Sequence, residues 1–142
     1  MSDTIFSKII RGEIPCHRIY QDEWVIAFLD INPLSRGHTL VVTKEPVATI
    51  GELSDKAAAG LGHALPRICR AVMKATGATA YNLLQNNGRE AGQEVMHVHV
   101  HIIPRYAPGG GGEESGLRVA WRPTRLDQAD GADLARHIAR LL

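Results

Sequence analysis

Three histidines, His97, His99 and His101, occupy every second position of one short stretch. Aliphatic residues alternate with them, at Val98, Val100 and Ile102. Side chains of a β-strand alternate between the two faces of a sheet, so a strand would present all three imidazoles on one face. A helix would fan them around its axis instead, and the Val and Ile content favours a strand.

This imidazole-lined face has one structural and three chemical interpretations. The structural one is a half-exposed strand that carries histidine on its solvent side. The chemical ones are a metal site, a nucleophilic site and a pH-sensing face, since each ring titrates near neutrality. Two strand histidines with His38 as third ligand would suit zinc with an open position. No carboxylate or thiolate follows at ligand spacing, whereas the central His99, flanked by partners, is well placed to be a nucleophile with one nitrogen free.

A polar loop precedes the histidines, Asn86-Asn87-Gly88-Arg89-Glu90-Ala91-Gly92-Gln93-Glu94. Its glycines let backbone amides approach a ligand closely. Amide side chains and N–H groups of this kind hold phosphate oxygens, although the same composition also fits an ordinary hairpin loop. Beside three imidazoles, the loop favours a phosphate over a metal.

Length and composition limit the class of protein. The chain has 142 residues, enough for one domain, with 44% hydrophobic residues, 22% charged residues and a net charge of +1. These values predict a globular protein that binds neither nucleic acid nor membranes. The N-terminus lacks the layout of a signal peptide, and Cys16 and Cys69 form no disulfide framework, so we expect a reducing, cytoplasmic location.

The elements that must position the histidines follow from hydrophobic periodicity and turn residues. Strands are predicted at 18–21, 24–29, 39–43, 80–85 and 97–104. A short helix should follow Thr4, which can cap it, and a long helix should span 54–75 on a stripe of apolar residues at Leu61, Leu65, Ile68 and Val72. Pro66 should kink the long helix or mark a boundary in it. A terminal helix should start at Asp130 as its cap. The order predicts an α+β fold with a five-stranded antiparallel sheet, one long helix and two flanking helices.

A glycine-rich segment follows the last strand, Pro108-Gly109-Gly110-Gly111-Gly112-Glu113-Glu114-Ser115-Gly116. It lacks the Lys-Ser/Thr of a phosphate-binding P-loop, so we interpret it as a linker. The predicted organisation is a core domain at 1–106, a flexible glycine-rich loop at 107–117 and a C-terminal extension with the terminal helix at 118–142.

The run from Gly92 through Ile103, Gln93-Glu94-Val95-Met96-His97-Val98-His99-Val100-His101-Ile102 between them, resembles the signature of the histidine triad family of nucleotide hydrolases and transferases. The resemblance continues upstream at 5–15, 27–33 and 37–42 and covers roughly residues 4–105. It implies a sheet that continues across a homodimer. Its implied catalytic residues are His99 as nucleophile, His97 and His101 as flanking partners, and His38 as a supporting fourth histidine. Its implied nucleotide contacts are Asp30 to the ribose, Phe28 and Ile31 to the base, and Asn86, Gly92, Gln93 and Glu94 to the phosphate.

The resemblance is to the purine nucleoside phosphoramidase branch. It implies hydrolysis of nucleoside 5′-phosphoramidates or related nucleotidyl conjugates, purine preferred, through a nucleotidyl-phosphohistidine that releases the nucleoside monophosphate. One alternative is a dinucleoside polyphosphate hydrolase, although Asp30 and Asn86 favour the phosphoramidase branch. Another is a non-catalytic nucleotide-binding module. No cofactor is expected, and no metal, because Thr4, Ser7 and Pro46 stand where many bacterial members carry zinc ligands.

The expected partners are a purine nucleoside monophosphate or its conjugates and a second copy of the chain. Small residues adjoin the stripe of the long helix, at Ala57, Ala58, Ala64 and Ala71. They would let a second helix approach closely, although alanine is also the best helix former. Together with the pairing of sheets that the resemblance implies, they predict a homodimer with one complete active site in each protomer.

Overall fold

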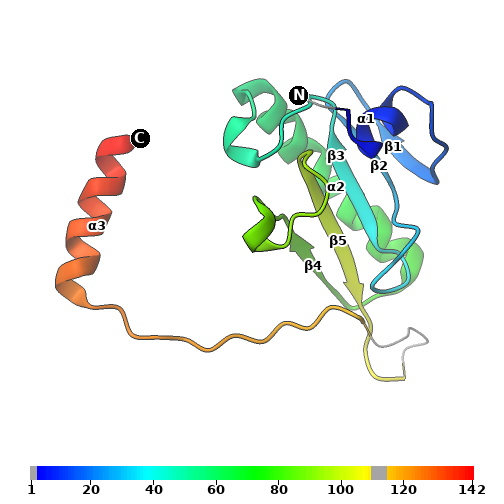
Figure 1. Ribbon diagram of the computed structural model, residues 1–142. Coiled ribbons are helices and arrows are strands. Elements are labelled where there is room, and N and C mark those ends of the chain that lie inside the picture. Colours follow the sequence, from blue (N-terminus) through cyan, green and yellow to red (C-terminus); the bar gives the residue numbers. More distant parts are fainter. Residues whose placement is uncertain (1–2, 110–114) are drawn as a thin grey trace.

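The computed structural model describes residues 3–109 and 115–142. Its centre is a five-stranded antiparallel sheet in the order β1-β2-β3-β5-β4 (Figure 1). The strands are β1 (Arg18–Gln21), β2 (Val25–Leu29), β3 (Thr39–Thr43), β4 (Ala80–Leu84) and β5 (His99–Arg105). The helices are α1 (Ile5–Ile10), α2 (Asp55–Thr76) and α3 (Gln128–Leu141), with short 3-10 turns at Ile50–Glu52 and Arg89–Ala91. The predicted α+β class and all five strands are confirmed.

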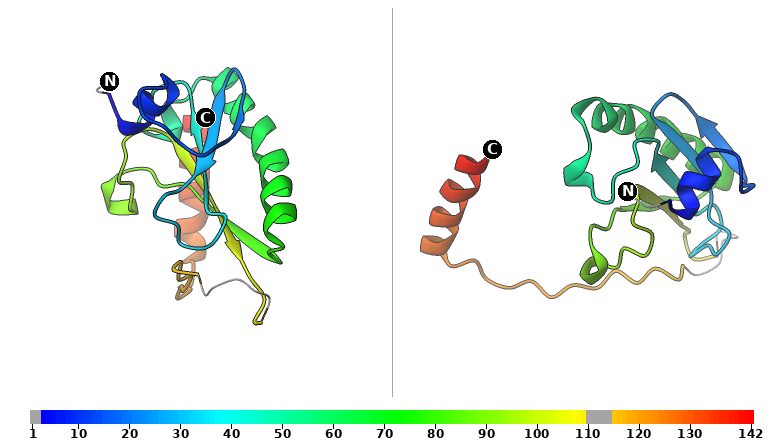
Figure 2. Two further views of the ribbon diagram at one scale, coloured as in Figure 1. Left: turned by 90° about the vertical axis from the view of Figure 1, so that its right-hand side faces the viewer. Right: turned by 45° about the horizontal axis from the view of Figure 1, so that its top comes forward.

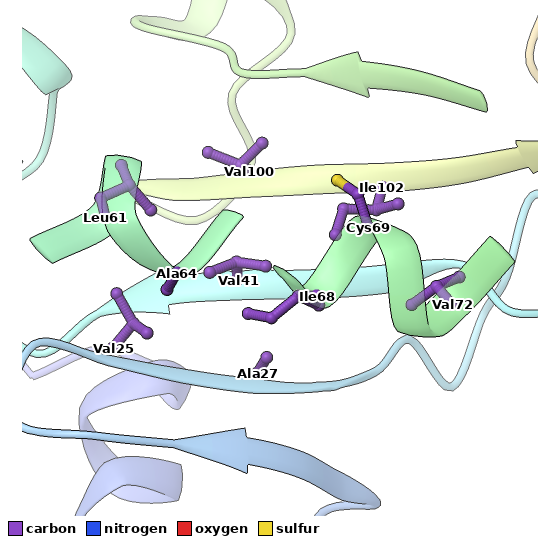
Figure 3. Close-up of a cluster of buried hydrophobic side chains, with 10 residues drawn as sticks. All are labelled: Val25, Ala27, Val41, Leu61, Ala64, Ile68, Cys69, Val72, Val100 and Ile102. Atoms are coloured by element: carbon purple, nitrogen blue, oxygen red, sulfur yellow. The ribbon is translucent and has the colours of Figure 1, made fainter. Parts of the chain in front are cut away.

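The two faces of the sheet carry different layers. Toward α2, alternate strand residues form one buried cluster with the helix (Figure 3), namely Val25, Ala27, Val41, Leu61, Ala64, Ile68, Cys69, Val72, Val100 and Ile102. The other face packs on α1 through Phe6, Ile9, Ile26, Phe28, Leu40 and Val42. The histidines of β5 alternate with Val100 and Ile102 and so belong to the α1 face, as the period of two predicts.

Helix α2 runs unbroken for 22 residues between two clear end signals. The Ser54 hydroxyl accepts the Ala57 N–H at its start, and Gly77, with φ of 71°, ends it in the left-handed conformation. Pro66 lies inside the helix and marks no boundary. Gly60 is required for packing on the sheet, because a Cβ there would lie 2.4 Å from Cβ and Cγ of Trp24.

Helix α1 is held at its start by a reciprocal capping box. The Thr4 side chain accepts the Ser7 N–H at 3.1 Å, and the Ser7 hydroxyl accepts the Thr4 N–H at 3.3 Å. This confirms Thr4 as the cap and satisfies N–H groups that a helix start leaves unpaired. It also fixes the Thr4 hydroxyl beside the site described below.

The C-terminal segment stands apart from the sheet (Figures 1 and 2). The prediction that α3 starts at Asp130 is wrong: it starts at Gln128, and the Asp127 carboxylate accepts the Asp130 N–H at 2.9 Å. Both aspartates suit a helix start, and the one three residues ahead of the bonded N–H takes the cap. The middle of the predicted flexible loop, 110–114, lies outside the described residues, so that part of the domain prediction stays untested.

Within the described residues, no helix has both the length and the hydropathy to cross a membrane.

Candidate active site

The histidines gather where β5 begins, in the middle of the sheet. His99 pairs with Val42 and His101 with Leu40 of β3. His97 lies ahead of the strand, which begins at His99 and not at 97 as predicted. The ring centroids of His99 and His101 lie 5.0 Å apart, so the two side chains form one continuous imidazole surface.

His99 presents a free nitrogen toward the pocket. Its Nδ1 lies 2.6 Å from the carbonyl oxygen of His97. A carbonyl only accepts, so Nδ1 carries the hydrogen and Nε2 keeps its lone pair. The ring is buried, and the Phe6 ring of α1 packs edge-on against it at a centroid distance of 4.9 Å. The orientation is that of a nucleophile with a fixed tautomer.

His101 is oriented through His38 by a chain of hydrogen bonds that begins in the backbone. The Leu34 N–H donates to His38 Nδ1 at 3.0 Å, so the hydrogen of His38 sits on Nε2. That Nε2 lies 2.9 Å from His101 Nδ1 and donates to it. His101 therefore carries its own hydrogen on Nε2 and offers an N–H donor next to His99.

His97 is fully buried, with both ring nitrogens bonded to protein atoms. Nε2 lies 2.6 Å from the Thr43 carbonyl oxygen and must donate to it. Nδ1 then accepts, and its partner is the hydroxyl of Thr4 at 3.2 Å. His97 thus leaves no nitrogen for a substrate and positions the carbonyl that holds His99.

Burial keeps the histidines neutral. It is the largest cause lowering the pKa of His38, His97 and His99 below the ordinary value of 6.5, and for His38 and His99 the charge of Asp30 opposes it. For His101, burial together with His99 and His38 lowers the pKa to about 4. A neutral imidazole is the form that can attack phosphorus.

A cavity of about 460 Å³ opens in front of His99 and His101. Its size suits a small molecule of nucleotide dimensions. Of the residues predicted to touch a nucleotide, Phe28, Asp30, Ile31, Gly92 and Glu94 line it, together with His38, His99 and His101. Asp30 is held at the rim, where one carboxylate oxygen accepts the Asn32 N–H at 2.8 Å.

Gln93 and Asn86 are not among the residues that line the cavity, and both hold the loop before β5 through hydrogen bonds. The buried Gln93 accepts the Gly88 N–H at 2.8 Å and donates to the carbonyl oxygens of Ala48 and Val95, at 2.7 and 3.0 Å. Asn86 donates to the Gly92 carbonyl at 3.3 Å. Direct phosphate contacts from these two side chains stay predictions.

Two groups of site residues escaped the sequence reasoning. The sequence predicted Thr4 only as a helix cap, although the same hydroxyl bonds His97. The two residues are 93 positions apart, and a contact over that separation leaves no local pattern in the sequence. The sequence did not predict the apolar part of the cavity lining, which comes from α1 and the segment after it, at Ile5, Phe6, Ile9, Ile14, Pro15 and Cys16. The spacing Phe6/Ile9 and the extended Ile14-Pro15 were the signals available.

One set of side chains in the described part of the chain has a geometry that a metal ion could use, Asp30, His38 and His101. Its two imidazole nitrogens face each other at 2.9 Å, which is the distance of a shared hydrogen. This geometry fits a hydrogen atom shared between the two rings.

Comparison with known proteins gives one consistent result. Residues 11–108 match the HIT domain. The adenosine 5′-monophosphoramidase hnt1 of Schizosaccharomyces pombe is 50% identical over 117 residues, 82% of this chain and 81% of that one. The adenylylsulfatase HINT3 of Arabidopsis thaliana is 46% identical over 104 residues, 73% of this chain, which spans about half (53%) of that protein.

The solved structures agree on the fold. The crystal structure of a HIT family member from Bacillus subtilis superposes with a TM-score of 0.89 at 39% identity, covering 99% of this chain and 98% of that one. The matched residues include β5 and the loop that precedes it. The chain belongs to the HIT domain family.

Proposed function

We propose that this protein hydrolyses nucleoside 5′-phosphoramidates and related nucleotidyl conjugates, with a preference for purines, and releases the nucleoside monophosphate. The observation that carries the proposal is the state of His99, which lines the cavity with its Nδ1–H bound to the His97 carbonyl and so keeps the lone pair on Nε2. The substrates that the relatives' names give, an adenosine monophosphoramidate for hnt1 and an adenylyl sulfate for HINT3, support the substrate class. Both substrates join an adenylyl group to a leaving group.

In the first step, His99 Nε2 attacks the α-phosphorus and the bond to the leaving group breaks. The new phosphohistidine keeps its Nδ1–H, and the His97 carbonyl stabilises the positive charge that the ring acquires. An ordinary histidine side chain would have to be turned and desolvated first. Here burial and Phe6 have already fixed the ring.

An amine departs only when a proton reaches its nitrogen. A bound phosphate raises the proton affinity of the surrounding imidazoles, so the site takes up one proton with the substrate. His101 delivers it through Nε2–H, the donor that the chain from Leu34 and His38 directs into the cavity. Water then opens the intermediate, releases the monophosphate and returns the proton.

The remaining contacts are assigned by position. Asp30, at the rim, would accept hydrogen bonds from the ribose hydroxyls, while Phe28 and Ile31 enclose the base. Glycine is required at 92, where φ is 90°, and it lets the backbone at 92–94 approach the phosphate. The leaving group would then face solvent and be weakly selected.

The test compares substrates and traps the intermediate. Steady-state rates are measured on adenosine, guanosine and cytidine 5′-phosphoramidates and on a diadenosine polyphosphate. The matched control is His63→Asn, which replaces an exposed histidine of α2. We expect faster purine phosphoramidate cleavage and an acid-labile adenylyl-protein in single turnover. A preference for the diadenosine compound would make the protein a polyphosphate hydrolase, and the absence of a labile adduct would make it a binding module.

We also propose a homodimer with separate active sites, since one chain supplies the whole cavity. Strand β4 ends the sheet and exposes Tyr81 and Leu83, which are 44% and 49% accessible. An unpaired apolar edge is a liability unless it is covered. Light scattering should give twice 15.5 kDa, and an active species of 15.5 kDa would refute the dimer.

A further inference from the structure

The C-terminal helix α3 carries an apolar stripe that none of the described residues buries. Leu134, Ile138 and Leu141 recur at intervals of four and three and are 50%, 51% and 74% exposed. In the described part of the chain, none of the 14 residues of α3 is buried. A helix of this length is marginal in water without tertiary packing, so its stripe requires a surface.

The arm that carries α3 is long enough to reach a neighbour. Its start is fixed to the core, where Gly116 N–H donates to the Leu34 carbonyl and Arg105 donates to the Leu117 carbonyl. Residues 117–127 then run without helix or strand, away from the sheet (Figure 1). Eleven extended residues span up to about 36 Å, close to the diameter of a folded core of 100 residues. An arm of this length can place α3 about one core diameter away from its own sheet.

The arm is shared with a solved relative. The likeness to the Bacillus subtilis structure covers 99% of this chain at a TM-score of 0.89, so it includes residues 117–141. A helix held out at the same place in two proteins has a common reason to be there. A second copy of the chain is the one partner that every such protein has available.

A matching acceptor lies on the sheet face away from the histidines. A groove of about 470 Å³ runs between β1, the end of β2 and the C-terminal half of α2. Its walls are mostly aliphatic, from Ile19, Leu29, Ile68, Ala71, Val72 and Ala75. Arg36 and Arg67 stand among them and give the groove a positive charge.

We propose that α3 of one chain seats in this groove of a second copy. Leu134, Ile138 and Leu141 would enter the aliphatic floor. Asp130, one turn before Leu134 on the same side of the helix, and Asp133 would face Arg36 and Arg67. By two-fold symmetry the exchange is reciprocal: each copy lends its own α3 and receives the α3 of its partner. The groove is separate from the nucleotide cavity, so the inference does not depend on the proposed activity.

A directed disulfide test uses two different chains. One full-length variant carries Ala71→Cys in the groove and the other Leu134→Cys on α3, both with Cys16→Ala to remove the half-exposed native thiol. When the two variants are mixed and mildly oxidised, we expect a covalent product of the two chains, reversed by reductant. Either variant alone should give a much lower yield of dimer.

A second substitution pair tests the face of the helix. Ile138→Asp, added to the Leu134→Cys chain, should lower the cross-linking yield by about tenfold or more, since it puts a charge into an apolar floor. Ala139→Asp, on the opposite side of α3, should leave the yield unchanged. The proposal is overturned if a chain that carries both Ala71→Cys and Leu134→Cys forms the disulfide within itself as a monomer, which would place α3 in its own groove. It is equally overturned if no cross-link forms, or if Ile138→Asp and Ala139→Asp change the yield to the same extent.

Discussion

The first and third histidines of the triad have the same side chain and the same spacing from His99, yet they have opposite surroundings. His97 is completely buried, and both of its nitrogens are bonded to Thr43 and Thr4. His101 is only half-buried and has one nitrogen bonded to His38, while the other remains for the cavity. Alternation along the chain brings the three rings together, but the neighbouring elements decide which nitrogen each ring offers. In the proposed reaction, His97 is therefore a support and His101 a donor.

The largest effect should come from the residue between them. His99→Asn keeps a polar side chain of similar size but removes the nucleophilic nitrogen, so turnover should fall by on the order of 10⁴-fold or more. Circular dichroism should show an unchanged fold. Near-normal turnover in this variant would remove His99 from the mechanism.

The second largest effect on turnover should come from substitution of His101. His101→Asn should lower kcat by about 10²–10³-fold on a phosphoramidate, because the amine then leaves without its proton source. On an adenylyl conjugate with a weakly basic leaving group, the loss should be much smaller. Equal losses on both substrates would mean that His101 acts on the phosphate and not on the leaving group.

Substitution of Thr4, which bonds His97, should have a smaller and indirect effect on turnover. Thr4→Val removes the hydroxyl that donates to His97 Nδ1, and we expect about a tenfold loss in kcat with little change in KM. Thr4→Ser should restore activity, because the hydroxyl is the group that matters. The ¹⁵N shifts of the His97 ring should change in the valine variant; if they do not, the loss of activity reflects the cap of α1 alone.

The smallest effect is on stability and depends on pH. An unfolded imidazole has a pKa near 6.5, while burial lowers the pKa of all four site histidines and brings His101 to about 4. Between these values the unfolded state binds more protons, so the free energy of unfolding should decrease as pH falls from about 6.5 toward 4. The melting temperature, followed from pH 8 to pH 4, should be flat at first and then decline by several degrees. His101→Asn should weaken that decline, whereas His63→Asn should not.

Much of the architecture could be predicted because its signals are local. The five strands follow from alternation, and Ser54 and Gly77 mark the ends of the long helix. Pro66 was harder to interpret, since a proline in a helical pattern fits both a boundary and an uninterrupted helix. The cap of α3 was misassigned because Asp127 and Asp130 are equivalent by composition.

The sequence could predict which residues gather at the candidate site, but not the hydrogen bonds that they make there. The spacing of the histidines gave their shared face, and the family resemblance named His38 and Asp30. The tautomers depend on carbonyl and N–H groups of Thr43, His97 and Leu34, which no side-chain pattern encodes. Thr4 meets His97 only after the whole sheet has formed.

The position of β5 between β3 and β4 gives the molecule an uneven pattern of opening. Amides of a central strand exchange with solvent only when most of the structure opens, whereas those of exposed loops exchange through local fluctuations. We expect Val100 and Ile102 to be among the slowest amides in deuterium exchange, and residues 86–92 among the fastest. His99 therefore belongs to the last part of the protein to unfold, and the loop at the edge of the cavity to one of the first. On warming, the loop that we propose to bind the phosphate should open well before the strand that carries His99.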